Sequence, residues 1–395
     1  MRLKLKIFGN PYILFAVSWT LCLGLYALKW ALIFPPLKID LLIFILILII
    51  IFGATGLMYK RLSYSPKILR IIKTNQNQLL IINIILFLPN FVYSGIPIIN
   101  GLRDADFGIP TLKVFAVSFN GFVSVYYFYL FLLTAKRKYL LNVLLCLMLF
   151  VLIISRGYVV MSLISMFFLW LNVKRPILTL KKVAIIFCGA LIAMYLFGVA
   201  GNYRTIKDIA SYNNNFDTHY NSDIILQIGQ ASNDFKKSIV PGEFFWSYLY
   251  FASPLSNLQY NVSQKPPELT LTNFNDLIIN EVFFDFISKR IDDIYKTKHK
   301  LPELVVNELT VCTFLAGSYI YAGWLGMVIL SLILWIIPFI YMYLIKNNPI
   351  GIIGISILCT IFFFSIFDNM LILSPLSIQL FFPLILGKGV LFNKS

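Results

Sequence analysis

Charged residues are scarce in this chain of 395 residues. Only 13% of the residues are Asp, Glu, Lys or Arg, whereas soluble domains contain about 25%. Hydrophobic residues make up 59% of the chain, and the mean hydropathy is +0.83. This composition excludes an ordinary water-soluble domain and indicates a protein embedded in a lipid bilayer.

Residues for metal binding and disulfide bonding are also few. His219 and His299 are the only histidines, and the five cysteines all lie in or beside apolar runs. The chain contains no metal-ligand spacing, no phosphate-binding glycine loop and no nucleophile-elbow motif. We therefore expect free buried thiols, no metal centre and no cofactor.

Acidic residues are almost confined to one stretch. Residues 201–310 hold 13 of the 17 Asp and Glu but only ten of the 33 Lys and Arg. The net charge of this stretch is therefore −3, whereas that of the whole chain is +16. The basic surplus therefore lies in short loops between apolar runs. Such a distribution is a topology signal and not a nucleic-acid-binding patch.

Ten apolar segments approach the length of about 20 residues that crosses a bilayer. They are residues 11–34, 39–59, 78–100, 111–134, 139–154, 157–172, 183–200, 322–345, 350–367 and 371–390. The predicted fold is an all-α polytopic membrane protein of about 10 transmembrane helices. We divide it into an N-terminal bundle of about seven helices (1–200), a large loop with interfacial helices (201–310) and a C-terminal bundle of about three helices (311–395). Basic residues alternate between successive loops, which predicts both termini in the cytoplasm and the large loop outside.

Two segments have lengths that do not fit a single crossing. Residues 139–172 would span about 50 Å as one helix, too long for a bilayer. Two short helices meeting at Ser155-Arg156-Gly157 solve this problem and leave Arg156 recessed near lipid head-group depth. Residues 311–346 are also too long, so we interpret 311–321 as an interfacial or re-entrant piece, with the crossing starting near Ala322.

Two arginines are candidates for chemistry. Arg156 is either an arginine that snorkels at a hairpin turn or an anion ligand, because a charge at that depth is costly without a partner. Arg204, in Gly201-Asn202-Tyr203-Arg204, is either an ordinary interfacial arginine or a second ligand. Together they could clamp a lipid-linked pyrophosphate, which guanidinium groups match bidentately.

The large loop contributes further candidates. Residues 243–258 are rich in aromatics, among them Trp246, Tyr248 and Tyr250, which form either an interfacial aromatic belt or a platform that stacks on sugars. Residues 274–295 have the pattern of an amphipathic helix, on which Arg290 lies on the polar face. His219 and His299 are either solvated loop residues or a catalytic base.

Several short motifs resemble those of the Wzy-type O-antigen (oligosaccharide repeat-unit) polymerases. They are Ser155-Arg156-Gly157, the Gly-Asn-Tyr-Arg of 201–204, the stretch Tyr250–Leu258, and Thr313–Tyr319 followed by Ala322–Gly326. The layout, with a large periplasmic loop in the second half, is also similar. Some family members carry an arginine motif with a glycine eleven positions later, but here Asn215 and Leu301 stand eleven positions after Arg204 and Arg290.

This resemblance implies a GT-C-like, metal-independent glycosyltransferase in the bacterial inner membrane. It would transfer a growing glycan from undecaprenyl pyrophosphate to another lipid-linked O-antigen repeat unit on the periplasmic face. By family logic, Arg156 and Arg204 bind the donor pyrophosphate, while His219, His299 or a loop carboxylate serves as the base. Arg290 is either a solvated residue of the helix face or a substrate ligand, and Trp246, Tyr248 and Tyr250 are the candidates for stacking on substrate sugars. The expected partners are the lipid-linked donor and acceptor, membrane lipid and, as a further candidate, a chain-length regulator protein.

Two alternative functions stay open. An O-antigen ligase shares the architecture and carries a histidine late in its loop, a position that His299 resembles. A flippase or other coupled transporter is less well supported, because no Asp, Glu or His lies in the middle of a predicted span.

Overall fold

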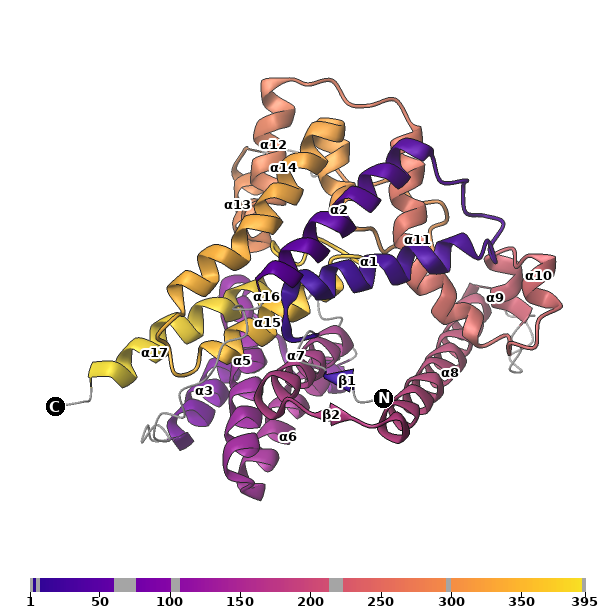
Figure 1. The fold of residues 1–395 in the computed structure, drawn as a ribbon. Coiled ribbons are helices and arrows are strands. Elements are labelled where there is room, and N and C mark those ends of the chain that lie inside the picture. The colour runs from indigo at the N-terminus through magenta and orange to yellow at the C-terminus, as the bar shows by residue number, and fades with distance from the viewer. Residues whose placement is uncertain are drawn as a thin grey trace.

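The computed structural model describes residues 3–4, 8–59, 76–100, 107–212, 223–295 and 300–392. This part of the chain is helical, apart from an antiparallel pair of two-residue strands, β1 (Leu3–Lys4) and β2 (Ile177–Leu178). The prediction of an all-helical protein is confirmed (Figure 1). The N-terminal helices are α1 (Pro11–Ala27), α2 (Ile39–Met58), α3 (Gln76–Ser94), α4 (Pro97–Asn100), α5 (Pro110–Thr134), α6 (Arg137–Leu152), α7 (Arg156–Lys174) and α8 (Leu180–Tyr212). The remaining helices are α9 (Asp223–Ile228), α10 (Asn233–Lys236), α11 (Phe244–Ser263), α12 (Leu271–Glu281), α13 (Asp285–Tyr295), α14 (Phe314–Leu344), α15 (Gly351–Phe364), α16 (Ser374–Ser377), the 3₁₀ turn η4 (Ile378–Leu380) and α17 (Phe381–Phe392).

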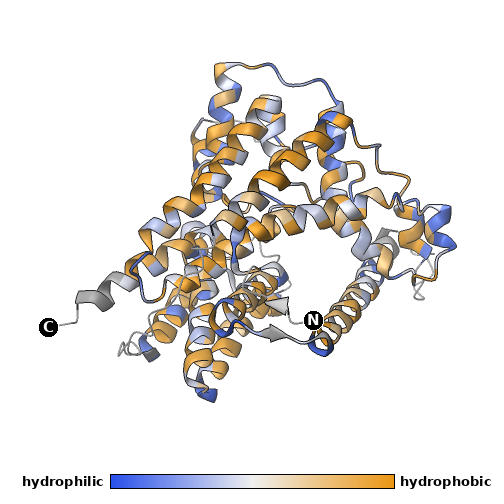
Figure 2. Cartoon of the chain, in the orientation of Figure 1, coloured by the Kyte–Doolittle hydropathy of each residue, from blue (hydrophilic) through white to orange (hydrophobic). Residues whose placement is uncertain are grey.

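Six helices in the described part are long and apolar enough to cross a membrane. They are α2, α3 with α4, α5, α7, α8 and α14. Figure 2 shows apolar residues along most of these helices, while hydrophilic residues gather at helix ends and over α10. The molecule is therefore a helical membrane protein by length and composition. Every predicted span contains helical residues, but α15, with 14 residues, is only about 21 Å long.

Short helices form the centre of the bundle. Helix α1 begins where the Asn10 side chain accepts a hydrogen bond from the Tyr12 amide, with Pro11 in the first turn. Its residue Trp19 is 1% exposed and donates to the Ser365 hydroxyl just after α15 (3.2 Å). Twelve of the 14 residues of α15 are buried, which explains how short apolar helices remain stable here: other helices surround them.

The predicted break in residues 139–172 is confirmed. Helix α6 ends at Leu152, α7 begins at Arg156, and Ile154 between them has the left-handed φ of 57°. A β-branched residue rarely adopts this conformation. The chain therefore turns at Ile153–Ser155 instead of continuing as one helix.

Helix α14 bends where the crossing was predicted to start. Ala322 and Gly323 have non-helical backbone angles, and Gly323 has a φ of +58°, which glycine adopts without steric cost. Residues 314–321, predicted as an interfacial piece, form the first helical turns of α14.

Helix α8 is longer than predicted. It continues past residue 200 to Tyr212 and so crosses the predicted boundary between the first two domains. Figure 1 shows it set apart from α3, α5, α6 and α7. It packs mainly on α11, where an added Cβ on Gly198 would lie 1.9 Å from the Glu243 carbonyl oxygen and the Ser247 hydroxyl donates to the Met194 carbonyl (3.1 Å).

The predicted amphipathic helix at 274–295 is in fact two helices, α12 and α13. The Asp285 amide donates to the Ile372 carbonyl (2.9 Å), and the Asp285 carboxylate accepts from the Ser374 amide (3.2 Å). The Asp285 amide thus bonds to Ile372, before α16, instead of to a carbonyl one turn back in α12, which the apolar pattern alone could not reveal.

Candidate functional site

The 201–310 segment packs against the loop between α1 and α2. The Leu32 amide donates to the Gln230 carbonyl (3.0 Å), and the Ser232 amide donates to the Trp30 carbonyl (2.8 Å). Asn257 and Asn261, one turn apart on α11, bind the extended chain before α14. Asn257 donates to the carbonyls of Leu309 (2.7 Å) and Val311 (2.9 Å).

A polar cavity of about 360 Å³ opens where α11 ends beside α14. Its lining combines two lysines, two amides, a carboxylate and a phenol with apolar residues: Asn261, Gln264, Lys265, Pro267, Lys300, Leu301, Glu303, Tyr319 and Ile320. Asn261 is structural, because its side chain both donates to the Glu303 carbonyl (2.8 Å) and accepts from the Glu303 amide (3.0 Å). Lys265 and Lys300 are exposed and give the cavity a positive wall.

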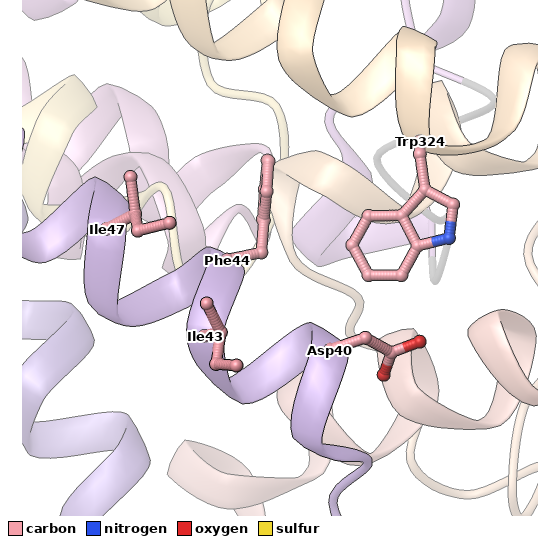
Figure 3. Close-up of a pocket in the computed structure, with 5 residues that line it drawn as sticks. All are labelled: Asp40, Ile43, Phe44, Ile47 and Trp324. Atoms are coloured by element: carbon pink, nitrogen blue, oxygen red, sulfur yellow. The ribbon is translucent and has the colours of Figure 1, made fainter.

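An apolar groove of about 400 Å³ lies on the other side of the α14 bend. Ile43, Phe44 and Ile47 of α2 line it together with Trp324 of α14, and Asp40 stands at its end (Figure 3). The Phe44 and Trp324 rings meet edge to face, with centroids 5.7 Å apart. Because Ile43 and Ile47 are 51% and 48% exposed, the groove is open at the surface of an apolar helix.

The cavity and the groove adjoin through two aromatic residues. Tyr319, which lines the cavity, packs edge to face on Trp324, which lines the groove, with centroids 6.3 Å apart. Asp40 lies close enough to the Tyr319 phenol to act on it electrostatically. Tyr319 precedes the bend at Ala322–Gly323 and Trp324 follows it. The bend therefore separates the polar cavity from the apolar groove.

A buried carboxyl lies on the opposite face of the first turns of α14. The Glu281 side chain, at the end of α12, is 6% exposed, and its Oε2 accepts from the Asn369 amide (3.0 Å). Burial, and secondarily the charge of Asp368, raises the pKa of Glu281 to about 8, despite the stabilising bond from Asn369. Asp368 still reaches the surface, yet the protein that surrounds it raises its pKa as well.

Arg156 and Arg204, the predicted pyrophosphate ligands, lie on different helices. Arg156 is the first residue of α7 and is exposed. Arg204 is also exposed, in the part of α8 that extends beyond residue 200. Neither arginine is among the residues that line the polar cavity. Their role as a clamp stays a prediction.

The three aromatic candidates of α11 have different surroundings. Tyr248 is 2% exposed, and its hydroxyl accepts a hydrogen bond from the Trp30 amide (3.1 Å), so it packs in the core. Trp246 lies against Gly201 of α8, where an added Cβ would be 2.5 Å from the indole nitrogen. Tyr250 is 38% exposed and packs on Phe197 of α8. Helix α11 also continues through Pro254 to Ser263, beyond the predicted end of the aromatic run.

The remaining predicted residues are remote from the cavity or are not described. Arg290 on α13 is exposed and donates a hydrogen bond to Thr111 at the start of α5. His219 and His299 lie outside the described residues, so their proposed roles as a base stay predictions.

Sequence reasoning missed the residues that line the groove and the cavity. Asp40 carried a usable signal, because it is one of only four acids outside residues 201–310. Lys265 and Lys300 carried none, since their proximity depends on the fold of the large segment. In the sequence, Glu281 lies on the apparent polar face of a single helix. In the structure it ends α12 and is buried, and this end could not be predicted from the sequence pattern.

Comparisons with protein-family models, with curated proteins and with solved structures give no match to this chain.

Proposed function

We propose that this protein is a bacterial inner-membrane polymerase, which transfers a growing undecaprenyl-pyrophosphate-linked glycan to another lipid-linked O-antigen repeat unit on the periplasmic face. One observation carries the proposal: an apolar groove, open at a membrane-type surface, adjoins a polar cavity with a positive wall. An amphiphilic substrate with a long apolar tail, an anionic linkage and a sugar head needs these two compartments side by side. The motif resemblance described above supports the same function.

The groove suits the isoprenoid tail. Its lining of branched and aromatic side chains is partly exposed, so a lipid can enter sideways from the bilayer without losing its apolar surroundings. The tail-to-head boundary would then lie at Trp324 and Tyr319. In the cavity, Lys265 and Lys300 would offset phosphate charge, and the neighbouring amide and hydroxyl groups would bind sugar hydroxyls.

A polymerase binds two lipid-linked molecules, a donor and an acceptor. Arg156 and Arg204 remain our candidates for the donor pyrophosphate, whereas the cavity and groove suit the acceptor. In the reaction, the bond between the anomeric carbon and the phosphate oxygen breaks, and an acceptor hydroxyl forms the new glycosidic bond. A base takes the hydroxyl proton, while undecaprenyl pyrophosphate leaves with its charge. Asp40, at the end of the groove, joins His219 and His299 as a candidate for this base.

Lipopolysaccharide banding on a gel tests the function directly. A strain deleted for the gene should produce core carrying a single repeat unit, and the wild-type gene should restore the ladder. If the deletion strain produced bare core alone, the result would contradict the polymerase function and favour a ligase or a flippase.

The same strain tests the residues. Arg156→Ala, Arg204→Ala and the double variant Lys265→Ala/Lys300→Ala should each shorten or abolish the ladder, with membrane levels matched to wild type. The exposed lysine Lys182→Ala, on α8, serves as the control and should restore a full ladder. A full ladder from both arginine variants would refute the clamp even where the polymerase function holds.

A further inference from the structure

Glu281 is the only Asp, Glu, Lys or Arg side chain that is buried among those whose exposure the structure describes. Burying an ionised carboxylate without a cation is costly, so such a group either finds a positive partner or keeps its proton. Glu281 forms no ion pair within the described part of the chain. Its partner is the neutral amide of Asn369, which donates to Oε2 (3.0 Å) and to the Glu281 backbone carbonyl (2.9 Å).

The Glu281 carboxyl also rests directly on α14. A Cβ added to Gly317 would lie 1.9 Å from Oε1 and 2.6 Å from the carboxyl carbon. Only a glycine therefore permits this contact. Asn369 and Gly317 thus hold the end of α12 between α14 and the turn that follows α15.

This contact lies behind the wall of the polar cavity. Tyr319, two residues after Gly317, lines the cavity. Tyr321 lies a further two residues along, and its hydroxyl accepts a hydrogen bond from the Lys300 amide (3.1 Å). The Lys300 amine lies 5.4 Å from the Tyr321 ring centre. The position of the first turns of α14 therefore sets the positions of Tyr319 and Lys300.

We propose that Glu281 is a positioning residue for this cavity: its neutral carboxylic acid holds α12 on α14, and its ionisation loosens that contact and displaces Tyr319 and Lys300. The proposal rests on the proposed function for its effect on catalysis, but the loosening itself is a property of the fold.

Among the residues that the structure describes, none places a positive charge in contact with the Glu281 carboxyl. Asp368 and Asn369 face it from the turn after α15, and Tyr321 faces it from α14. Asp285 acts on Asp368, while Asp276 and Asp292 act on Tyr321. Lys300 is the basic group in contact with Tyr321. A proton lost from Glu281 thus adds negative charge to an acidic neighbourhood.

The direction of the pH effect follows from the pKa of Glu281, which burial raises from 4.5 to about 8. The docked carboxyl holds its proton more tightly than a free one. Docking therefore weakens as the pH rises from 4.5 through about 8, and the full cost of ionisation is present above that range.

Hydrogen–deuterium exchange on the purified full chain in lipid nanodiscs tests the contact without any substrate. After correction for intrinsic exchange rates, peptides covering 271–281 and 314–321 should exchange several-fold faster above pH 8 than at neutral pH. Peptides from α15 should stay constant. Glu281→Gln keeps a neutral, isosteric side chain and should abolish the change, while Asp276→Asn on the same helix should retain it. An unchanged rate in the wild type, or a change that persists in Glu281→Gln, overturns the proposal.

Polymerisation of a purified lipid-linked repeat unit tests the consequence for the cavity. Wild-type activity should fall several-fold as the pH rises from neutrality through the Glu281 pKa and level off above it, where the cost of ionisation is complete. Glu281→Gln should remove this alkaline limb and leave neutral activity within about twofold of wild type. Retention of the limb in Glu281→Gln overturns the positioning role. Activity absent at every pH, with the exchange response intact, instead counts against the polymerase function alone.

Discussion

Two carboxyl groups flank the first part of α14, and their surroundings differ. Asp40 is exposed at the start of α2, where its Oδ1 accepts a hydrogen bond from the neighbouring Leu41 amide (2.8 Å). Glu281 is 6% exposed, contacts Gly317 and has the Asn369 amide as its donor. The first is open to solvent in the first turn of a helix, whereas burial stabilises the second as a neutral acid. The same functional group can therefore serve at a substrate-binding surface on one side of α14 and as a structural contact on the other.

Among these substitutions, Gly317→Ala should have the largest effect, on the stability of the contact between Glu281 and α14. The new methyl group would overlap the Glu281 carboxyl and force it away from Asn369. Overpacking of this kind costs about 1–3 kcal/mol, and the lost buried hydrogen bond adds to that cost. Thermal unfolding in detergent should show a clearly lower midpoint than wild type. Gly189→Ala, on the exposed α8, has nothing within 4 Å of the added Cβ and provides the matched control. Equal midpoints for the two variants would refute the tight contact.

Trp324→Leu should have an intermediate effect, on substrate use more than on folding. The variant keeps an apolar side chain but loses the ring contacts with Phe44 and Tyr319, each worth about 0.5–1.5 kcal/mol. KM for the lipid-linked acceptor should rise several-fold while kcat changes little, because the groove would bind the tail and not the reacting atoms. A matched substitution at Trp170 on α7, Trp170→Leu, should leave KM unchanged. A kcat loss without a KM change in Trp324→Leu would contradict the assignment of the groove.

Asp40→Asn should have the smallest effect on stability. An exposed carboxylate in a first helical turn contributes only about 0.3–1 kcal/mol, and Asn can still accept the Leu41 hydrogen bond. The unfolding midpoint should shift by a degree or two at most. A large destabilisation would show that Asp40 is a structural residue and not part of a binding surface.

The broad architecture followed from patterns that depend on local sequence. Apolar run length predicted the helices. The position of Arg156 within an overlong run predicted a turn at Ser155–Gly157, and the turn lies slightly earlier, at Ile153–Ser155. The excess length of residues 311–346 predicted a crossing that starts near Ala322, and α14 bends at Ala322–Gly323. These features are predictable because helix length and backbone conformation depend mainly on neighbouring residues.

The candidate site was much less predictable. The cavity brings Lys265 together with Lys300 and Tyr319, and the groove brings Asp40 beside Trp324, across separations that no periodic pattern encodes. Aromatic content was also a poor guide to exposure, as the buried Tyr248 shows. The burial of Glu281 depended on the break between α12 and α13, which arises from hydrogen bonds to residues 372 and 374.

The side-by-side course of α2 and α14 has a consequence for the chain as a whole. Phe44 meets Trp324 near one end of the pair and Tyr59 meets Phe339 near the other, so the two helices run in the same direction. In a bilayer, two helices of equal direction require an odd number of crossings between them. Four helices that are long and apolar enough to cross lie between α2 and α14 in the described part of the chain, namely α3 with α4, α5, α7 and α8. An odd number therefore requires a fifth crossing, for which α6, with 16 residues, is the candidate. A fifth crossing would place the loop before α2 and the 201–310 segment on one side of the membrane, in agreement with the hydrogen bonds of Trp30 with Ser232 and Tyr248. Loss or gain of a single crossing would therefore separate two halves of the same surface by the full thickness of the bilayer.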